Sequence, residues 1–191
     1  MRRRCCVPSV PSCWPCLAVR GTVAAGQIVW MAVAMVTTVA TLDARQADLA
    51  AVVEFQRAAD AYAFQHRQVE RRAAGATARD AMAAGMRALR PRARDGDFFT
   101  PLVAAAFRSR LARALKSPGC SLGPATADFA VPRPNQDAGA APAIPACAAD
   151  VLPQLPPELE YRAAGVALLL VDTHAGLVVD VLHAAFPRPD N

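Results

Sequence analysis

Residues 118–157 hold nine of the sixteen prolines of the chain and a single aromatic residue, Phe129. Proline fixes φ and has no backbone N–H, so it interrupts helices and the interior of sheets. Neither helical nor strand periodicity survives here, which predicts a long loop without regular structure. A loop of this length is unusual inside a compact domain and usually needs a tether or a functional role.

Two cysteines, Cys120 and Cys147, flank most of this loop. In an oxidising compartment they could pair, and their Cα atoms would then lie about 4.4–6.8 Å apart. Closing the loop would contribute roughly 3–4 kcal/mol on the chain-entropy model. Two free thiols are the alternative that the sequence leaves open.

Before the loop, apolar residues recur at helical spacing. Between residues 46 and 72 they form one stripe, made of Val52, Phe55, Ala59, Tyr62, His66 and Val69. Thr77 and Asp80 form a capping box for a second, shorter helix that ends at Pro91. Its side chains expected to point inward are Met82, Met86 and Leu89.

A third helix is expected to start at Pro101 behind the cap residue Thr100 and to stop at Pro118-Gly119. After the loop the hydrophobic period changes to two, as in strands. Turns at Gly165 and Ala175-Gly176 separate this alternating run, residues 159–163, from two apolar strands, residues 166–171 and 177–182. The sequence therefore predicts an α+β fold of about three helices, the long loop and a C-terminal three-stranded antiparallel meander.

Residues 1–42 have the layout of a leader. Thr22–Leu42 carry no formal charge, and four arginines precede them. This order is typical of a signal peptide or of an N-terminal membrane anchor. Small residues favour cleavage after Ala40, whereas the length of the run also suits a retained anchor. In either case we expect residues 43–191 to form a single exported domain, periplasmic or in the cell envelope, with membrane contact only through residues 22–42 if they are retained.

The net charge of +5 does not indicate an acidic partner. Four of the twenty-one basic residues lie in the leader, and all sixteen acidic residues lie beyond residue 42. The domain is thus nearly neutral, and no nucleic-acid partner is expected.

Residues 67–94 are rich in arginine. We expect these side chains to lie on solvated helix surface, and contact with anionic lipid headgroups is the alternative.

Asp172 and His174 stand two residues apart and so share one face of a strand. With His66 they form a set that is metal-like in residue type. A two-residue turn at Ala175-Gly176 would send Asp180 to the opposite face, and a three-residue turn would bring it back. The sequence does not choose between these registers.

The simpler interpretation is structural. An Asp or His at a hairpin end commonly bonds turn backbone groups, and His66 is expected to be a hydrogen-bonded core histidine. We therefore predict no cofactor and no metal site. Cys13-x-x-Cys16 has thiol oxidoreductase spacing but lacks the βαβ context, and no nucleophile elbow, phosphate-binding loop or H-E-x-x-H motif is present.

Three segments of the chain, residues 53–72, 98–108 and 156–180, resemble parts of a group of uncharacterised exported bacterial proteins. The motifs that carry the likeness are Phe98-Phe99-Thr100-Pro101 and Asp172-Thr173-His174-Ala175. The resemblance implies export and a helical half followed by a β-hairpin, and no activity. We expect a non-enzymatic protein of structural or interaction type. The alternative is a small hydrolase or metal-dependent enzyme that uses Asp172 and His174.

Overall fold

A computed structural model describes residues 25–72, 78–123 and 129–187, with side chains from Asp43 onward. The chain divides into two units, Met1–Ala40 and Thr41–Asn191. The Cys13-x-x-Cys16 motif, the side chains of the predicted leader and the predicted cap at Thr77 lie outside the described residues. Among the described residues, no helix is both long enough and apolar enough to cross a membrane.

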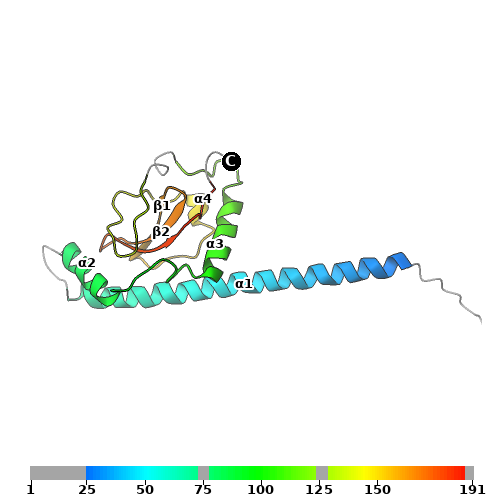
Figure 1. Cartoon of the computed structure of the whole chain (residues 1–191), viewed down its shortest axis with the longest axis horizontal. Coiled ribbons are helices and arrows are strands. Elements are labelled where there is room, and N and C mark those ends of the chain that lie inside the picture. The colour runs from blue at the N-terminus through cyan, green and yellow to red at the C-terminus, as the bar shows by residue number, and fades with distance from the viewer. Residues whose placement is uncertain (1–24, 73–77, 124–128, 188–191) are drawn as a thin grey trace, which may run out of the picture. The chain divides into compact units, whose positions relative to one another are not determined.

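The α+β prediction is confirmed (Figure 1). Three helices come first: α1 (Ala25–Glu70), α2 (Ala78–Leu89) and α3 (Pro101–Ala114). The antiparallel sheet follows in the order β1-β2-β3, with β1 (Leu159–Ala164), β2 (Ala167–Asp172) and β3 (Leu177–Leu182).

The Pro-rich segment is more ordered than predicted. It contains a four-residue helix, α4 (Ala146–Ala149), which begins directly after Pro145. Asp137 and Ala143 also form isolated bridges, to Leu177 and Arg162 of the sheet. The bridges depend on strands that lie elsewhere in the chain, so the sequence pattern of the segment itself does not reveal them.

The stripe predicted on α1 is buried, with Phe55, Ala59 and Tyr62 all at most 3% exposed. Ala51 is buried at the start of the stripe in place of Val52. On α2 the prediction for Leu89 is wrong, since this side chain is 50% exposed. Ala83 is buried together with the two methionines, which rotates the buried face of α2 away from Leu89.

The sheet is buried on both faces. On one face Leu168 and Leu170 join the core formed by the helices, which includes Phe55 and Phe107. On the other face, residues of β2 and β3 pack against Ala138, Ala141 and Phe129 of the Pro-rich segment. Every residue of β2 and β3 is buried as a result, which explains why both strands are apolar except for Asp172 and Asp180.

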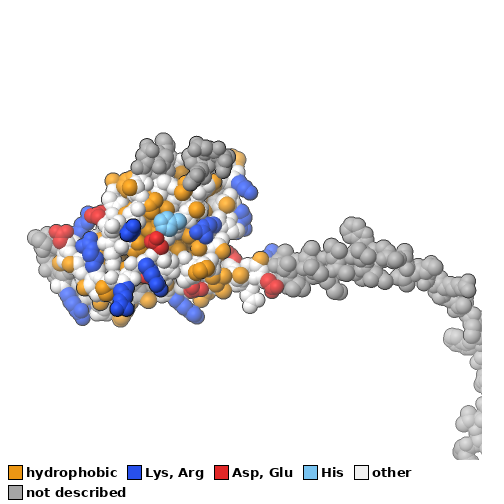
Figure 2. All heavy atoms as spheres, in the orientation of Figure 1, with side chains coloured by type: hydrophobic (Ala, Val, Ile, Leu, Met, Phe, Trp, Pro, Cys, Tyr) orange, Lys and Arg blue, Asp and Glu red, His pale blue; other side chains and the backbone are white. Residues whose placement is uncertain are grey.

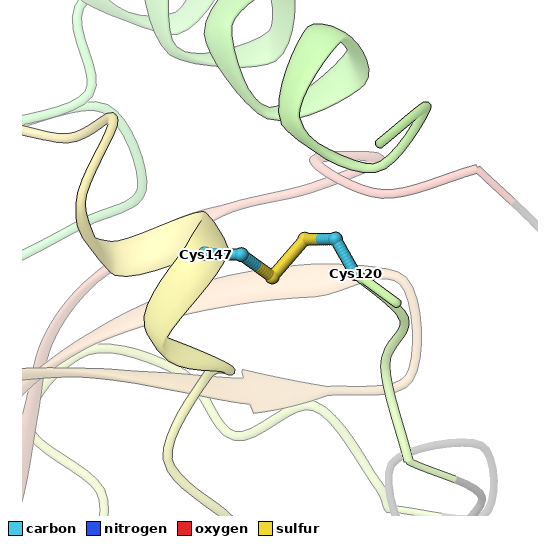
Figure 3. The surroundings of a disulfide bond; sticks show 2 residues. All are labelled: Cys120 and Cys147. Carbon is cyan, nitrogen blue, oxygen red and sulfur yellow. A yellow bond between two sulfur atoms is a disulfide. The ribbon is translucent and has the colours of Figure 1, made fainter. Parts of the chain in front are cut away.

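Cys120 and Cys147 form a disulfide, with Cα atoms 5.9 Å apart (Figure 3). Cys147 belongs to α4, and Cys120 follows the end of α3. The bond closes a sequence separation of 27 residues and so tethers the segment that covers the second face of the sheet.

Removing the disulfide should destabilise the protein by roughly 3–4 kcal/mol, because the unfolded chain regains the entropy of an open loop. We expect the Cys120→Ala/Cys147→Ala variant to show this loss in denaturant unfolding followed by circular dichroism. The reduced native protein should lose a similar amount, and the variant should not respond to reductant. Equal stability of the oxidised native protein and the variant would contradict a tethering role.

One ion pair links α1 to α3. Arg110 donates from Nη2 and Nε to the two oxygens of Asp48, at 2.6 and 3.0 Å. This hydrogen bond to the guanidinium holds the pKa of Asp48 below its usual value, although burial acts in the opposite direction. A carboxylate whose pKa is lower in the folded than in the unfolded state stabilises the fold at pH values above the unfolded-state pKa. This contribution is lost as the pH falls through the folded-state pKa.

Asp48→Asn should therefore lower the free energy of unfolding at pH 7 by about 1 kcal/mol, since the pair is only partly buried. The difference from the native protein should shrink as the pH falls below about 3.8, the ordinary pKa of aspartate. Asp60→Asn, an exposed position on the same helix, is the control and should change little. A difference in unfolding free energy between Asp48→Asn and the native protein that does not depend on pH would contradict a stabilising ion pair at Asp48.

Candidate functional site

The β2–β3 turn differs from both predicted registers. Asp172 pairs with Leu177, so four residues form the loop. The Oδ1 atom of Asp172 accepts the backbone N–H groups of His174 and Ala175, at 3.0 and 2.8 Å. Gly176, at φ +68°, closes the turn by donating to the carbonyl of Asp172. This side-chain-to-backbone bonding favours the longer loop.

A β-bulge then returns Asp180 to the face of the sheet that the helices cover. Leu170 pairs with Asp180 and Val171 with Val178, which leaves Val179 as the extra residue. Burial raises the pKa of Asp180, and hydrogen bonds from backbone N–H groups only partly oppose this. Three of these bonds come from the loop before α3, from Gly96 at 2.9 Å and from Phe98 and Phe99 at 2.7 Å each, and the fourth comes from Val181 at 2.7 Å. Asp180 therefore anchors that loop.

Asp172 and His66 meet in the interior, where both are fully buried. The Oδ2 atom of Asp172 accepts a hydrogen bond of 2.7 Å from the Tyr62 hydroxyl. The Nε2 atom of His66 lies 3.3 Å from Oδ1 of Asp172, within ion-pair distance. This contact does not meet strict hydrogen-bond geometry, and Nδ1 of His66 has no hydrogen-bond partner among the described residues. His66 is therefore a buried core histidine, as predicted, with Asp172 beside Nε2 and an unpartnered nitrogen at Nδ1.

The carboxylates around His66 favour positive charge on its ring. Burial lowers the pKa of His66, but Asp172, Glu70 and Glu158 outweigh it and the net direction is upward. Burial likewise raises the pKa of Asp172, but the contact with His66 and the hydrogen bonds from the Ala175 N–H and Tyr62 outweigh it, and the net direction is downward. The site therefore holds an ionised carboxylate beside a ring that is biased toward a cationic state.

Glu70 and His174 complete the cluster at the surface. Glu70 Oε2 lies 4.0 Å from Nδ1 of His66, and Glu70 Oε1 lies 3.2 Å from Nδ1 of His174. The two histidine rings are 5.1 Å apart and meet edge to face. Sequence reasoning named His66, Asp172 and His174 but missed Glu70. The spacing of His66 and Glu70 could have indicated this residue, since side chains four residues apart on a helix lie on the same face.

The arginines of residues 67–94 do not all project freely into solvent. Arg67 donates to Glu158 at 2.7 Å, and Arg90 to Asp97 at 3.3 Å. Arg90 also lies over the rings of Tyr62 and Phe98. Figure 2 shows Lys and Arg side chains dispersed over the visible face, with acidic and hydrophobic side chains between them. Several of these arginines therefore have structural roles.

Comparison with protein-family models, with curated proteins and with solved structures finds no match. The function therefore has to be argued from the sites themselves.

Replacing Asp180 by Ala should lower the free energy of unfolding by about 2–4 kcal/mol, because buried N–H groups of Phe98 and Phe99 lose their acceptor. Asp137→Ala is the matched control, since its carboxylate accepts one exposed bond, from Gly139. That change should cost about 1 kcal/mol or less. Equal losses of unfolding free energy in the two variants, measured by chemical denaturation, would contradict the anchoring role of Asp180.

Proposed function

We propose that residues 43–191 form an exported, extracytoplasmic domain that acts by binding, without catalysing a reaction. The single observation that best supports this is the Cys120–Cys147 disulfide, because disulfides persist mainly in oxidising compartments. The charge-free run Thr22–Leu42 behind a basic N-terminus supports the same location. The resemblance to exported bacterial proteins adds the same expectation.

The hydrogen bonding of the buried carboxylates supports a non-enzymatic role. Asp172 receives hydrogen bonds from Tyr62 and from two turn N–H groups, and Asp180 receives four from backbone N–H groups. A general base needs a free oxygen within reach of a substrate proton. The oxygens of these two carboxylates are instead occupied in holding the turn and the loop.

A surface cavity at the end of α3 also gives no support for catalysis. The described residues that line it include two charged side chains, Arg108 and Lys116, and otherwise Ala, Leu, Phe and Pro. This lining offers cations and apolar surface, with no carboxylate, imidazole, thiol or hydroxyl group among those residues.

The second candidate is a metal-dependent enzyme that uses Asp172 and His174. One observation favours it, namely that His66 lies beside Asp172 and that His66 and Glu70 lie close to His174. Because Asp172 is occupied, this candidate depends on metal binding by the other three side chains.

Export predicts that the domain is oxidised and accessible from outside the cytoplasm. In cells that express the full chain, protease added to spheroplasts should degrade it, and alkylation without reductant should leave Cys120 and Cys147 unmodified. N-terminal sequencing then separates the two leader alternatives, since cleavage after Ala40 gives a chain that begins at Thr41. A full-length, fully alkylated chain in the cytoplasmic fraction would refute the proposal.

A further inference from the structure

The candidate ligand set combines two residues of α1 with one from the β2–β3 turn. His66 and Glu70 lie four residues apart on α1, and His174 follows Asp172 in the turn. One ligand atom from each side chain lies within 4.8 Å of the other two. Ligand atoms around a tetrahedral ion at about 2.0–2.1 Å lie roughly 3.3 Å from one another. The side chains of Glu70 and His174 are 51% and 49% exposed, so they can move closer to His66 and reach the spacing that a bound ion requires.

The state of His66 provides a second, independent observation. Its side chain is fully buried, and Nδ1, the nitrogen near Glu70, has no hydrogen-bond partner among the described residues. An orphaned buried nitrogen costs free energy, which a bound cation or proton would offset. From these two observations we propose that His66, Glu70 and His174 bind a divalent transition-metal ion, with Zn²⁺ as the best fit.

Asp172 is suited to the role of a positioning residue for this site. Histidine ligands commonly place the ring nitrogen that does not bind metal against a carboxylate, which fixes the tautomer. Asp172 lies 3.3 Å from Nε2 of His66, on the opposite side of the ring from Nδ1. The Tyr62 hydroxyl and the turn N–H groups hold the carboxylate in place. Nδ1 is therefore the nitrogen left for the metal, which on binding takes the place of any proton there.

The donor set selects the class of metal. Two imidazoles and one carboxylate suit Zn²⁺ and similar ions, whereas Ca²⁺ and Mg²⁺ prefer oxygen ligands alone. Glu70 and Asp172 also supply two negative charges to balance a divalent cation. Arg67 is paired with Glu158, and Arg79, which lies against Gly176, is exposed and screened by water. Three protein ligands leave a fourth position for water or for a donor group of a partner.

The test uses the purified full chain with the four leader cysteines replaced by serine, so that their thiolates contribute no metal binding. Zn²⁺ binding is measured by calorimetry and by competition with a chromophoric chelator, and Co²⁺ substitution reports the geometry. We expect one ion per chain and a visible Co²⁺ spectrum of tetrahedral type. His174→Ala and Glu70→Gln change half-exposed side chains, so the fold should survive, and each should weaken binding at least tenfold.

The third histidine of the chain provides the matched control. His183 is also exposed and lies 2.9 Å from a carboxylate, that of Asp95, but belongs to no ligand cluster found among the described residues. His183→Ala should leave Zn²⁺ affinity unchanged, and Asp172→Asn should weaken it about 10–100-fold. Absence of stoichiometric Zn²⁺ binding, or binding that survives both His174→Ala and Glu70→Gln, would overturn the proposal. Either outcome leaves the export proposal standing, since that is tested by location and disulfide state.

Discussion

The carboxylate of Asp172 holds the helical half and the sheet of this protein in register with each other. It lies at the end of β2, where it accepts two N–H groups of its own turn and the hydroxyl of Tyr62 from α1. A buried carboxylate is stable only when its oxygens are bonded in this way. The same group faces His66, one turn further along α1. The position of the histidine cluster thus follows from how one charge is accommodated in the core.

The sheet imposes a second constraint. Its central strand, β2, is apolar and buried on both faces, so each face needs its own cover. The helices supply one cover, and the Pro-rich segment supplies the other. Such a segment has little internal structure to hold it in place, and the Cys120–Cys147 bond supplies that restraint. The disulfide therefore helps to bury the apolar strands, because it restrains the segment that covers one face of the sheet.

Much of this fold could be predicted from local patterns. The 3.6-residue spacing of Phe55, Ala59 and Tyr62 predicts the buried face of α1, and Thr100 with Pro101 predicts the start of α3. Two cysteines that flank a loop without a tether predict the disulfide. These features depend on residues that are close in sequence or on the number of cysteines, so they can be predicted from one sequence.

The site could be predicted only in part. Sequence patterns named His66, Asp172 and His174, but the link between α1 and the turn spans more than a hundred residues of chain, and no local pattern reports it. Glu70 was missed because its role depends on that contact. The bulge at Val179 was missed because it results from the bonding of Asp180 to a loop some eighty residues earlier. Long-range contacts of this kind decide which polar residues meet.

The most direct test of the account is anomalous diffraction at the zinc absorption edge from crystals of the protein grown with Zn²⁺. The account predicts one strong peak about 2.0–2.2 Å from His66 Nδ1, His174 Nδ1 and a Glu70 oxygen. It also predicts that the Asp172 carboxylate still faces Nε2 of His66. A map without a peak at this cluster, or with zinc at His183 alone, would contradict it.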